Sequence, residues 1–275
     1  MIKQYLFASD FDQTLSFNDS GMVLTELLGI PVEEFKEKAA GMAQLNLVQQ
    51  GAELAYLLLH DPAFSSRVRR EHLIETGKRL PLKENIELLY RTLREGIPGY
   101  EFNFYVLSAA PVEIVQSALE GIVPIDHIYG TEFQYGANGA IERLIRCTAG
   151  YGKVTRIMQL QEEQSIGLDH VVYAGDGSSD MNAMLHVNEG DGLTIAVSES
   201  RCVTQIAKRT VLSDNALSVL VPILEEVAHW TQPQIRRFFE SHGFLMQEWA
   251  RMRTDFVTLR STSAPSSIAA AAEAQ

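Results

Sequence analysis

The chain has 275 residues, of which 46% are hydrophobic and 21% charged, as in soluble globular proteins of one or two domains. A formal net charge of −12 argues against a nucleic-acid backbone or an anionic membrane as the main partner. The two cysteines, Cys147 and Cys202, belong to no metal-binding motif, which argues against a zinc site or a disulfide framework. With no signal-peptide pattern and no apolar stretch of membrane-spanning length, we expect a cytoplasmic protein without a membrane partner.

The first element is a short apolar run, residues 5–8, which predicts a strand buried on both faces. Asp10, Asp12 and Thr14 follow it directly. Two carboxylates this close repel each other unless a cation or a proton lies between them. The carboxyl end of a buried strand is where open α/β sheets bind ligands, although the same residues can also form a solvated loop.

Residues 16–81 contain helical patterns and no strand pattern. Glycine and proline divide them into four expected helices, at residues 21–28, 32–46, 51–59 and 71–79. We therefore predict a helical domain that is inserted after the first strand and ends at Pro81.

From residue 82 onward, strand and helix patterns alternate. Strands are expected at 102–107, 127–129, 171–174 and 193–197, a hairpin at 131–145, and a last short strand at 211–212. Such alternation predicts an α/β fold: a Rossmann-like three-layer core, residues 1–15 and 82–230, with a mostly parallel sheet plus the inserted all-helical cap.

The C-terminal part begins with an expected helix at 215–230, which Pro222 would kink. An amphipathic pattern at 234–256 predicts a helical extension, residues 231–260, that covers the core edge or, alternatively, makes a dimer contact. Residues 261–275 are rich in Ser, Thr and Ala, which predicts a disordered tail.

Polar residues stand at several predicted strand ends and helix starts. Ser108 follows the second strand, Lys153 opens a helix, and Asp176 and Asp180 follow the strand at 171–174. Because the carboxyl ends of parallel strands share one edge, we expect these residues to meet Asp10 and Asp12 there. Carboxylates suit Mg²⁺, and a hydroxyl and an ammonium suit phosphate oxygens.

Each of these residues also has a structural reading. Ser108 could simply cap the next helix, and Asp180 could be a helix N-terminal charge. Lys153 could be solvated, with Arg156 as a rival for its role.

The order and spacing of these motifs resemble the haloacid dehalogenase (HAD) superfamily of phosphohydrolases over roughly residues 5–200. The chain carries the DxDxT signature at Asp10–Thr14, the strand-terminal serine at Ser108, the lysine at Lys153 and the acidic motif at residues 175–180. The helical insertion lies where this superfamily inserts its C1-type cap. The pattern is most similar to the phosphoserine-phosphatase-like branch.

The resemblance implies a Mg²⁺-dependent phosphomonoester hydrolase that acts on a small phosphorylated metabolite. It implies that Asp10 is the nucleophile that forms an aspartyl-phosphate and that Asp12 is the general acid and base. It further implies phosphate or substrate contacts from Thr14, Ser108, Ala109, Lys153 and Ser179, and a metal site of Asp10, the Asp12 carbonyl, Asp176 and Asp180. A phosphotransferase or mutase on the same fold, or a non-catalytic phospho-ligand-binding protein, is the alternative.

Two departures argue against phosphoserine as the substrate. Ser179 stands where that branch has asparagine, and Asp19 stands where it has a glutamate that contacts the substrate amine. The basic cap residues could pair with a second anionic group of the substrate, although a solvated helix face is the commoner reading. They are Lys36, Lys38, Arg67, Arg69 and Arg70.

Overall fold

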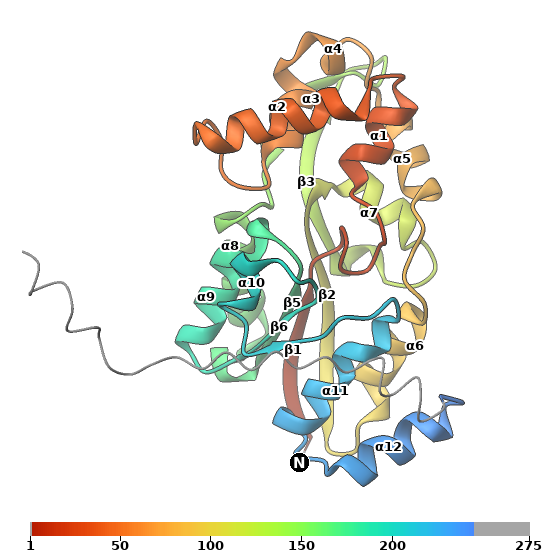
Figure 1. Ribbon diagram of the computed structural model, residues 1–275, viewed down its shortest axis with the longest axis vertical. Helices are drawn as coiled ribbons and strands as arrows, with labels where there is room; N and C mark the ends of the chain where they lie inside the picture. The colour runs from red at the N-terminus through yellow and green to blue at the C-terminus, as the bar shows by residue number, and fades with distance from the viewer. Residues whose placement is uncertain (1, 245–275) are drawn as a thin grey trace, which may run out of the picture.

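The computed structural model of the chain describes residues 2–244 and contains one seven-stranded sheet (Figure 1). The strand order is β4-β3-β2-β1-β5-β6-β7, and every neighbouring pair is parallel except β3 and β4. The strands are β1 (Lys3–Ser9), β2 (Tyr100–Pro111), β3 (Ile128–Tyr135), β4 (Ile141–Arg146), β5 (Val171–Gly175), β6 (Leu193–Ala196) and β7 (Arg209–Thr210). The predicted α/β fold with a mostly parallel sheet is confirmed.

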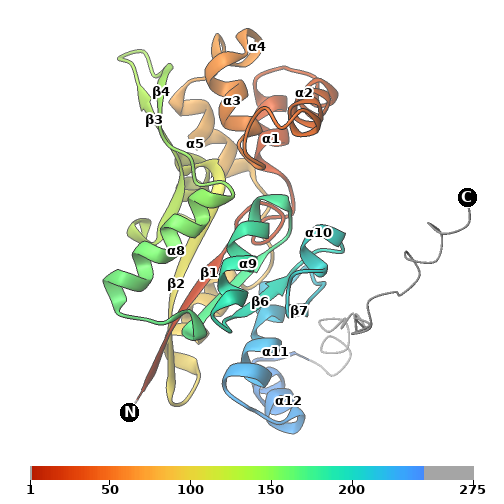
Figure 2. The same cartoon turned by 90° about the vertical axis from the view of Figure 1, so that its left-hand side faces the viewer.

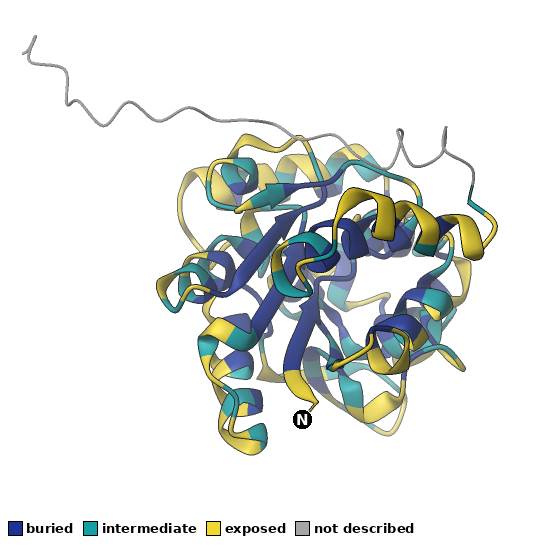
Figure 3. Cartoon of the chain, turned by 90° about the horizontal axis from the view of Figure 1, so that it is seen from below, coloured by how far each residue is buried: buried dark blue, intermediate teal, exposed yellow. Residues whose placement is uncertain are grey.

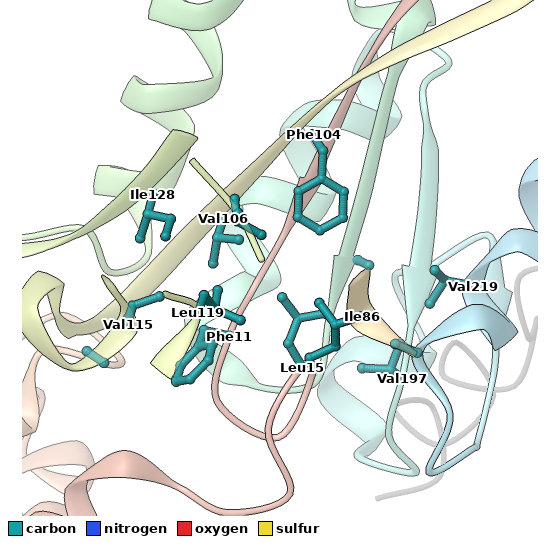
Figure 4. Packing of buried hydrophobic residues seen from close by; sticks show 14 of the residues in the cluster. Phe11, Leu15, Ile86, Phe104, Val106, Val115, Leu119, Ile128, Val197 and Val219 are labelled. Carbon is teal, nitrogen blue, oxygen red and sulfur yellow. The ribbon is translucent and has the colours of Figure 1, made fainter. Parts of the chain in front are cut away.

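Strand β1 lies at the centre of the sheet, and its side chains alternate between two apolar layers. Phe7 packs with Phe104 and Val106 on one face. Figure 4 shows Phe104 and Val106 together with Ile86 of α6 (Ile86–Arg91) and Val115 of α7 (Val112–Ala118). Leu6 and Ala8 point to the opposite face, which is covered by α8 (Tyr151–Gln164), α9 (Met181–Glu189) and α10 (Arg201–Thr204). Figure 3 shows the strands buried between these helices. Each fully buried large apolar side chain contributes about 2 kcal/mol, which explains why the central strands are apolar throughout.

Five helices lie together beyond the carboxyl ends of the strands (Figure 1). They are α1 (Ser20–Leu27), α2 (Val32–Gln44), α3 (Glu53–His60), α4 (Pro62–Ser65) and α5 (Arg70–Arg79). The chain leaves and re-enters the core at adjacent points, because Ser16 bridges Leu82 and the Phe17 N–H donates to the Pro81 carbonyl at 2.9 Å. The helices between Ser16 and Leu82 thus leave and rejoin the core at one place, and their standing as a separate cap domain stays a prediction.

Two contacts hold these helices against the core. Helix α5 packs closely on α7, where Gly77 leaves room for Ser117, whose Oγ donates to the Ile74 carbonyl at 2.9 Å. The β3–β4 hairpin rises beside α5 and α3 (Figure 2), and the Arg70 N–H donates to the Gly139 carbonyl at 2.8 Å. The five helices α1 to α5, which we call the cap, are therefore held over the carboxyl-end edge of the sheet.

Several predicted boundaries were wrong. Strand β2 continues through Ser108 to Pro111, residues 127–135 contribute one strand rather than two, and the last strand lies at 209–210 rather than 211–212. The expected helix at 215–230 is broken into short turns, partly because Pro222 has no N–H to donate. The short elements are η1 (Thr92–Gly96), η2 (Ile125–His127), η3 (Leu168–His170), η4 (Ser178–Asp180), η5 (Ala216–Val219), α11 (Leu220–Pro222) and η6 (Ile223–Val227).

The C-terminal extension contributes α12 (Gln232–Ser241), which buries Ile235 and Phe239 against the core edge. The helix expected at 234–256 ends at Ser241, and its remainder from residue 245 lies outside the described residues, as does the expected tail at 261–275. Within residues 2–244, none of the helices combines the length and the apolar character needed to cross a bilayer.

Candidate active site

Asp10 and Lys153 meet at the carboxyl end of the central strand. Asp10 is the first residue after β1, and its N–H donates to the Ala174 carbonyl on β5 at 2.9 Å. Lys153 lies in the first turn of α8, and its Nζ is 2.7 Å from Asp10 Oδ1. Both side chains are buried, so the ion pair is shielded from solvent. The structure thus brings together two of the predicted site residues, and it leaves Arg156 elsewhere, with its guanidinium 4.0 Å from the centre of the Tyr129 ring.

Asp180 contacts both Lys153 and the loop at residues 176–177. Its Oδ1 lies 2.6 Å from Lys153 Nζ and accepts a 2.6 Å hydrogen bond from the Tyr173 hydroxyl. Its Oδ2 accepts hydrogen bonds from the N–H groups of Asp176 and Gly177 at 3.0 and 3.1 Å. Asp180 is therefore a positioning residue as well as a metal-ligand candidate. Sequence reasoning missed Tyr173, whose one signal was a hydroxyl-bearing residue in an apolar buried strand, where that hydroxyl needs a partner.

Three carboxylates form a compact cluster at this point. Asp10, Asp176 and Asp180 each offer an oxygen, and these oxygens lie within 4.8 Å of one another. Burial, and then the charges of Asp10 and Asp180, raise the pKa of Asp176 to about 9. Burial and then Asp180 raise the pKa of Asp10 to about 6, against the opposing effect of Lys153. One lysine does not offset three carboxylates, of which Asp10 and Asp180 are buried, so a hard divalent cation such as Mg²⁺ fits this donor set.

Asp12 is turned toward the first cap helix. Its Oδ1 accepts a hydrogen bond from the Ser20 N–H at 3.1 Å, and its Oδ2 accepts one from the Ser20 hydroxyl at 2.7 Å. Burial, followed by the charge of Asp19, raises the pKa of Asp12 well above its usual range. The Asp12 carboxyl therefore retains a proton more readily than an exposed aspartate. Sequence reasoning missed Ser20, whose signal was a hydroxyl residue at a predicted helix start.

A cavity of about 410 Å³ lies between this cluster and the cap. Core residues at the sheet edge form its floor: Asp10, Asp12, Ser108, Ala109, Asp176 and Ser179. Cap residues form its upper wall, among them Asp19, Met22, Phe35, Lys36, Gly51, Glu53 and Leu54. Ser108 does not cap α7, because its Oγ accepts from the Ala110 N–H at 3.1 Å and faces the cavity.

Thr14 lies outside this cavity. It lines a separate small space with Ser9 and Lys83, and its Oγ1 is buried with no hydrogen-bond partner among the described residues. The Thr14 side chain therefore lies away from the cavity, and its expected contact with the substrate stays a prediction. Its backbone N–H bonds the Phe11 carbonyl at 3.2 Å, so Thr14 belongs to the turn that carries the two aspartates.

A tight turn of the cap packs against the loops that contain Ser179 and Ala109. The Ala52 N–H donates to the Gln49 carbonyl at 2.8 Å, and Gly51 has a φ of +86°, as the third position of a type II turn requires. A Cβ on Gly51 would lie 2.6 Å from the Ser179 Cβ and 3.5 Å from the Ala109 Cβ. The Gln49 amide donates to the Ala149 carbonyl, next to the start of α8. This turn therefore seats the cap directly on the site.

The basic cap residues mostly point elsewhere. Arg67 and Arg69 donate to cap carbonyls, and Arg70 lies 3.7 Å from Glu113. Lys38 pairs with Asp61 at 2.8 Å, and of the five candidates only Lys36 lines the cavity. The cap arginines are therefore excluded as direct substrate contacts in this arrangement.

Comparison with known proteins agrees with the motif pattern. The family model of the haloacid dehalogenase-like hydrolases matches residues 7–185, well over half of the chain. The chain therefore belongs to the haloacid dehalogenase-like hydrolase family. No curated protein matches it.

Solved structures show the same fold. A substrate-bound phosphoserine phosphatase is similar at a TM-score of 0.62 and 19% identity, over 82% of this chain and 99% of that one. A phosphoserine phosphohydrolase-like protein from Francisella tularensis subsp. tularensis SCHU S4 is similar at a TM-score of 0.60 and 19% identity, over 79% of this chain and 99% of that one. A gene product from Archaeoglobus fulgidus is similar at a TM-score of 0.66 and 14% identity, over 82% of this chain and 85% of that one. At these identities the likeness concerns the fold alone.

Proposed function

We propose that this protein is a Mg²⁺-dependent phosphomonoester hydrolase that acts on a small phosphorylated metabolite through an aspartyl-phosphate on Asp10. The observation that carries the proposal is the buried contact between Lys153 and Asp10, at the floor of a cavity that also contains Ser108, Asp176 and Ser179. A carboxylate can attack a phosphoryl group only when local positive charge offsets the repulsion between the two anions. Membership in the hydrolase family supports this reading.

The metal would be held by Asp10 and Asp176, with Asp180 as a third ligand or as the group that orients the loop. The four contacts that Asp180 already makes favour the orienting role. Bound there, Mg²⁺ would supply positive charge at the phosphoryl oxygens.

The reaction would proceed in two steps, in which Asp10 and Asp12 have different roles. In the first, an Asp10 carboxylate oxygen forms a bond to phosphorus while the ester oxygen leaves and takes the proton held by Asp12. In the second, Asp12 accepts a proton from water, which attacks phosphorus and releases inorganic phosphate, so that Asp10 is regenerated. The Ser108 and Ser179 hydroxyls, which line the cavity, would bind phosphate oxygens, and the turn at Gly51 would restrict the entry of water.

A phosphate-release assay with full-length protein tests the proposal. With p-nitrophenyl phosphate and Mg²⁺ we expect turnover that EDTA removes, and we expect Asp10→Asn to abolish it while the far-UV circular dichroism spectrum stays unchanged. The exposed Asp126→Asn is the matched control. No turnover with any divalent metal would favour the non-catalytic phospho-ligand-binding alternative.

The same assay separates hydrolysis from phosphoryl transfer, the other alternative on this fold. With added alcohols, a hydrolase releases one phosphate for each p-nitrophenol formed. A phosphotransferase releases less phosphate than p-nitrophenol, because part of it passes to the alcohol. The cytoplasmic location stays a prediction from the sequence.

A further inference from the structure

Glu53 gives the cap side of the cavity a charge that the proposed chemistry does not use. It is the first residue of α3, and its half-buried side chain lines the same cavity as Asp10. Burial raises the pKa of its carboxyl, and the nearby backbone N–H groups of Glu53 itself and of Gly51 oppose that effect. Glu53 thus lies in the cap wall of the cavity whose floor contains Asp10.

The rest of that wall is acidic and apolar. The Asp19 carboxylate caps α1 through the Met22 N–H at 3.1 Å, and Asp19 lines the same cavity as Glu53. Met22, Phe35 and Leu54 provide the apolar part. These acids are one wall of a cavity whose floor is the expected nucleophile, and they do not form a separate site.

Positive charge is scarce among the cavity-lining residues that the structure describes. Lys36 is the one basic side chain there, it is 55% exposed, and its ammonium lies 3.4 Å from the Glu33 carboxylate. Lys153 is fully buried and engaged by Asp10 and Asp180 at the phosphate end. A substrate carboxylate placed near Glu53 and Asp19 would therefore meet like charge without a dedicated cation.

We propose that Glu53 is a specificity-determining residue and that the substrate is a phosphomonoester whose leaving group carries an ammonium and lacks a carboxylate, as in a phosphorylated amino alcohol. The ammonium would lie against Glu53 and Asp19, and its short carbon chain against Met22 and Leu54. This inference rests on the proposed phosphatase activity. It differs from the substrate named for the phosphoserine phosphatase of similar fold, because phosphoserine carries a carboxylate as well as an amine.

A matched set of two-carbon substrates tests the charge preference in the full-length protein with Mg²⁺. Phosphoethanolamine has a cationic end, ethyl phosphate a neutral one and phosphoglycolate an anionic one. Phosphoserine, a three-carbon comparison outside the matched set, carries both charges. We expect kcat/KM for phosphoethanolamine to exceed that for ethyl phosphate by at least about tenfold, since a charge-assisted hydrogen bond accounts for that ratio. Phosphoglycolate should be the poorest, and phosphoserine should fall below phosphoethanolamine.

Two variants test whether Glu53 determines the preference for a cationic leaving group. Glu53→Gln should lower the kcat/KM ratio of phosphoethanolamine to ethyl phosphate by about tenfold, mainly through KM. Glu53→Arg should shift the preference toward phosphoglycolate. Glu37→Gln, an exposed cap carboxylate on α2 outside the cavity, is the matched control and should leave the ratio unchanged.

The outcomes distinguish this inference from the function on which it rests. If neither p-nitrophenyl phosphate nor any of these substrates is hydrolysed, both the phosphatase proposal and the charge preference are overturned. If hydrolysis occurs but phosphoglycolate or phosphoserine is preferred, or Glu53→Gln leaves the ratio unchanged, the charge preference alone is overturned.

Discussion

Lys153 and Asp10 are 143 positions apart in the chain, yet the lysine Nζ lies 2.7 Å from the aspartate Oδ1 in a fully buried contact. The same ammonium lies 2.6 Å from Asp180. One cation therefore joins the loop after β1, the start of α8 and the loop after β5. Its removal should affect both the chemistry and the stability of the fold.

Lys153→Met should lower the free energy of unfolding by about 3 kcal/mol, because it leaves two buried carboxylates without their partner. Urea denaturation followed by circular dichroism measures this loss. Lys38→Met is the matched control, since it removes a partly exposed pair with Asp61 and should cost about 1 kcal/mol or less. Equal losses in the two variants would mean that the buried ion pair contributes no more than a surface pair.

Gly51→Ala should displace the cap and raise KM. The new Cβ would lie 2.6 Å from the Ser179 Cβ, and the φ of +86° is unfavourable for alanine. Gly29→Ala separates these two effects, because Gly29 has a φ of +68° and no atom within 4 Å of an added Cβ. Both variants should lose about 1 kcal/mol of stability from backbone strain.

Steady-state kinetics should then distinguish the two glycines. Only the substitution at residue 51 is expected to change KM, because only that Cβ meets the core. If both variants keep the KM of the unmodified protein, the turn does not set the position of the cap.

Asp12→Asn should lower kcat by about 10² to 10⁴ while the protein stays folded, because the variant loses the proton that the leaving oxygen needs. The loss should be greater for an alkyl phosphate than for p-nitrophenyl phosphate, whose leaving group needs less protonation. Rapid-mixing kinetics with the aryl ester should show a burst of p-nitrophenol, because the second step still lacks its base. A uniform loss for both substrates, without a burst, would exclude Asp12 as the acid.

Mg²⁺ binding should release about one proton at pH 7.5. In the metal-free protein the pKa of Asp176 is raised to about 9, so this carboxyl is largely protonated at that pH and must lose its proton to bind a cation. Because its folded pKa exceeds its ordinary value, Asp176 stabilises the metal-free fold most at low pH. That contribution is lost as pH rises through about 9, whereas Mg²⁺ affinity increases over the same range.

Calorimetry in buffers of different ionisation enthalpy counts the released protons. The Asp176→Asn variant should release fewer protons on Mg²⁺ binding. Asp169 is an exposed residue of η3, and the Asp169→Asn variant should release as many protons as the unmodified protein. Binding with no proton exchange at pH 7.5 would show that Asp176 is ionised before the metal binds.

Local patterns predicted the core and the floor of the site. Apolar runs such as residues 5–8 and 171–174 identify buried strands, and parallel topology then brings the residues that follow them to one edge. For that reason Asp10, Lys153 and Asp176 could be expected to meet. The boundary errors, at β2 and after Pro222, occurred where sheet pairing or a missing N–H overrides local propensity.

The amino-acid sequence by itself determined the sheet, the position of the helical insertion and the residues at the sheet edge, because strand and helix periodicity and glycine or proline signals are local. Only the tertiary structure decided which way the cap faces. That direction depends on the packing of α5 on α7 and on the seat of Gly51 over Ser179. These contacts between distant segments turn the cap arginines away from the cavity, place Glu53 in its wall and bring Ser20 into contact with Asp12. Helix and strand periodicity is local and therefore does not predict the direction in which the cap faces.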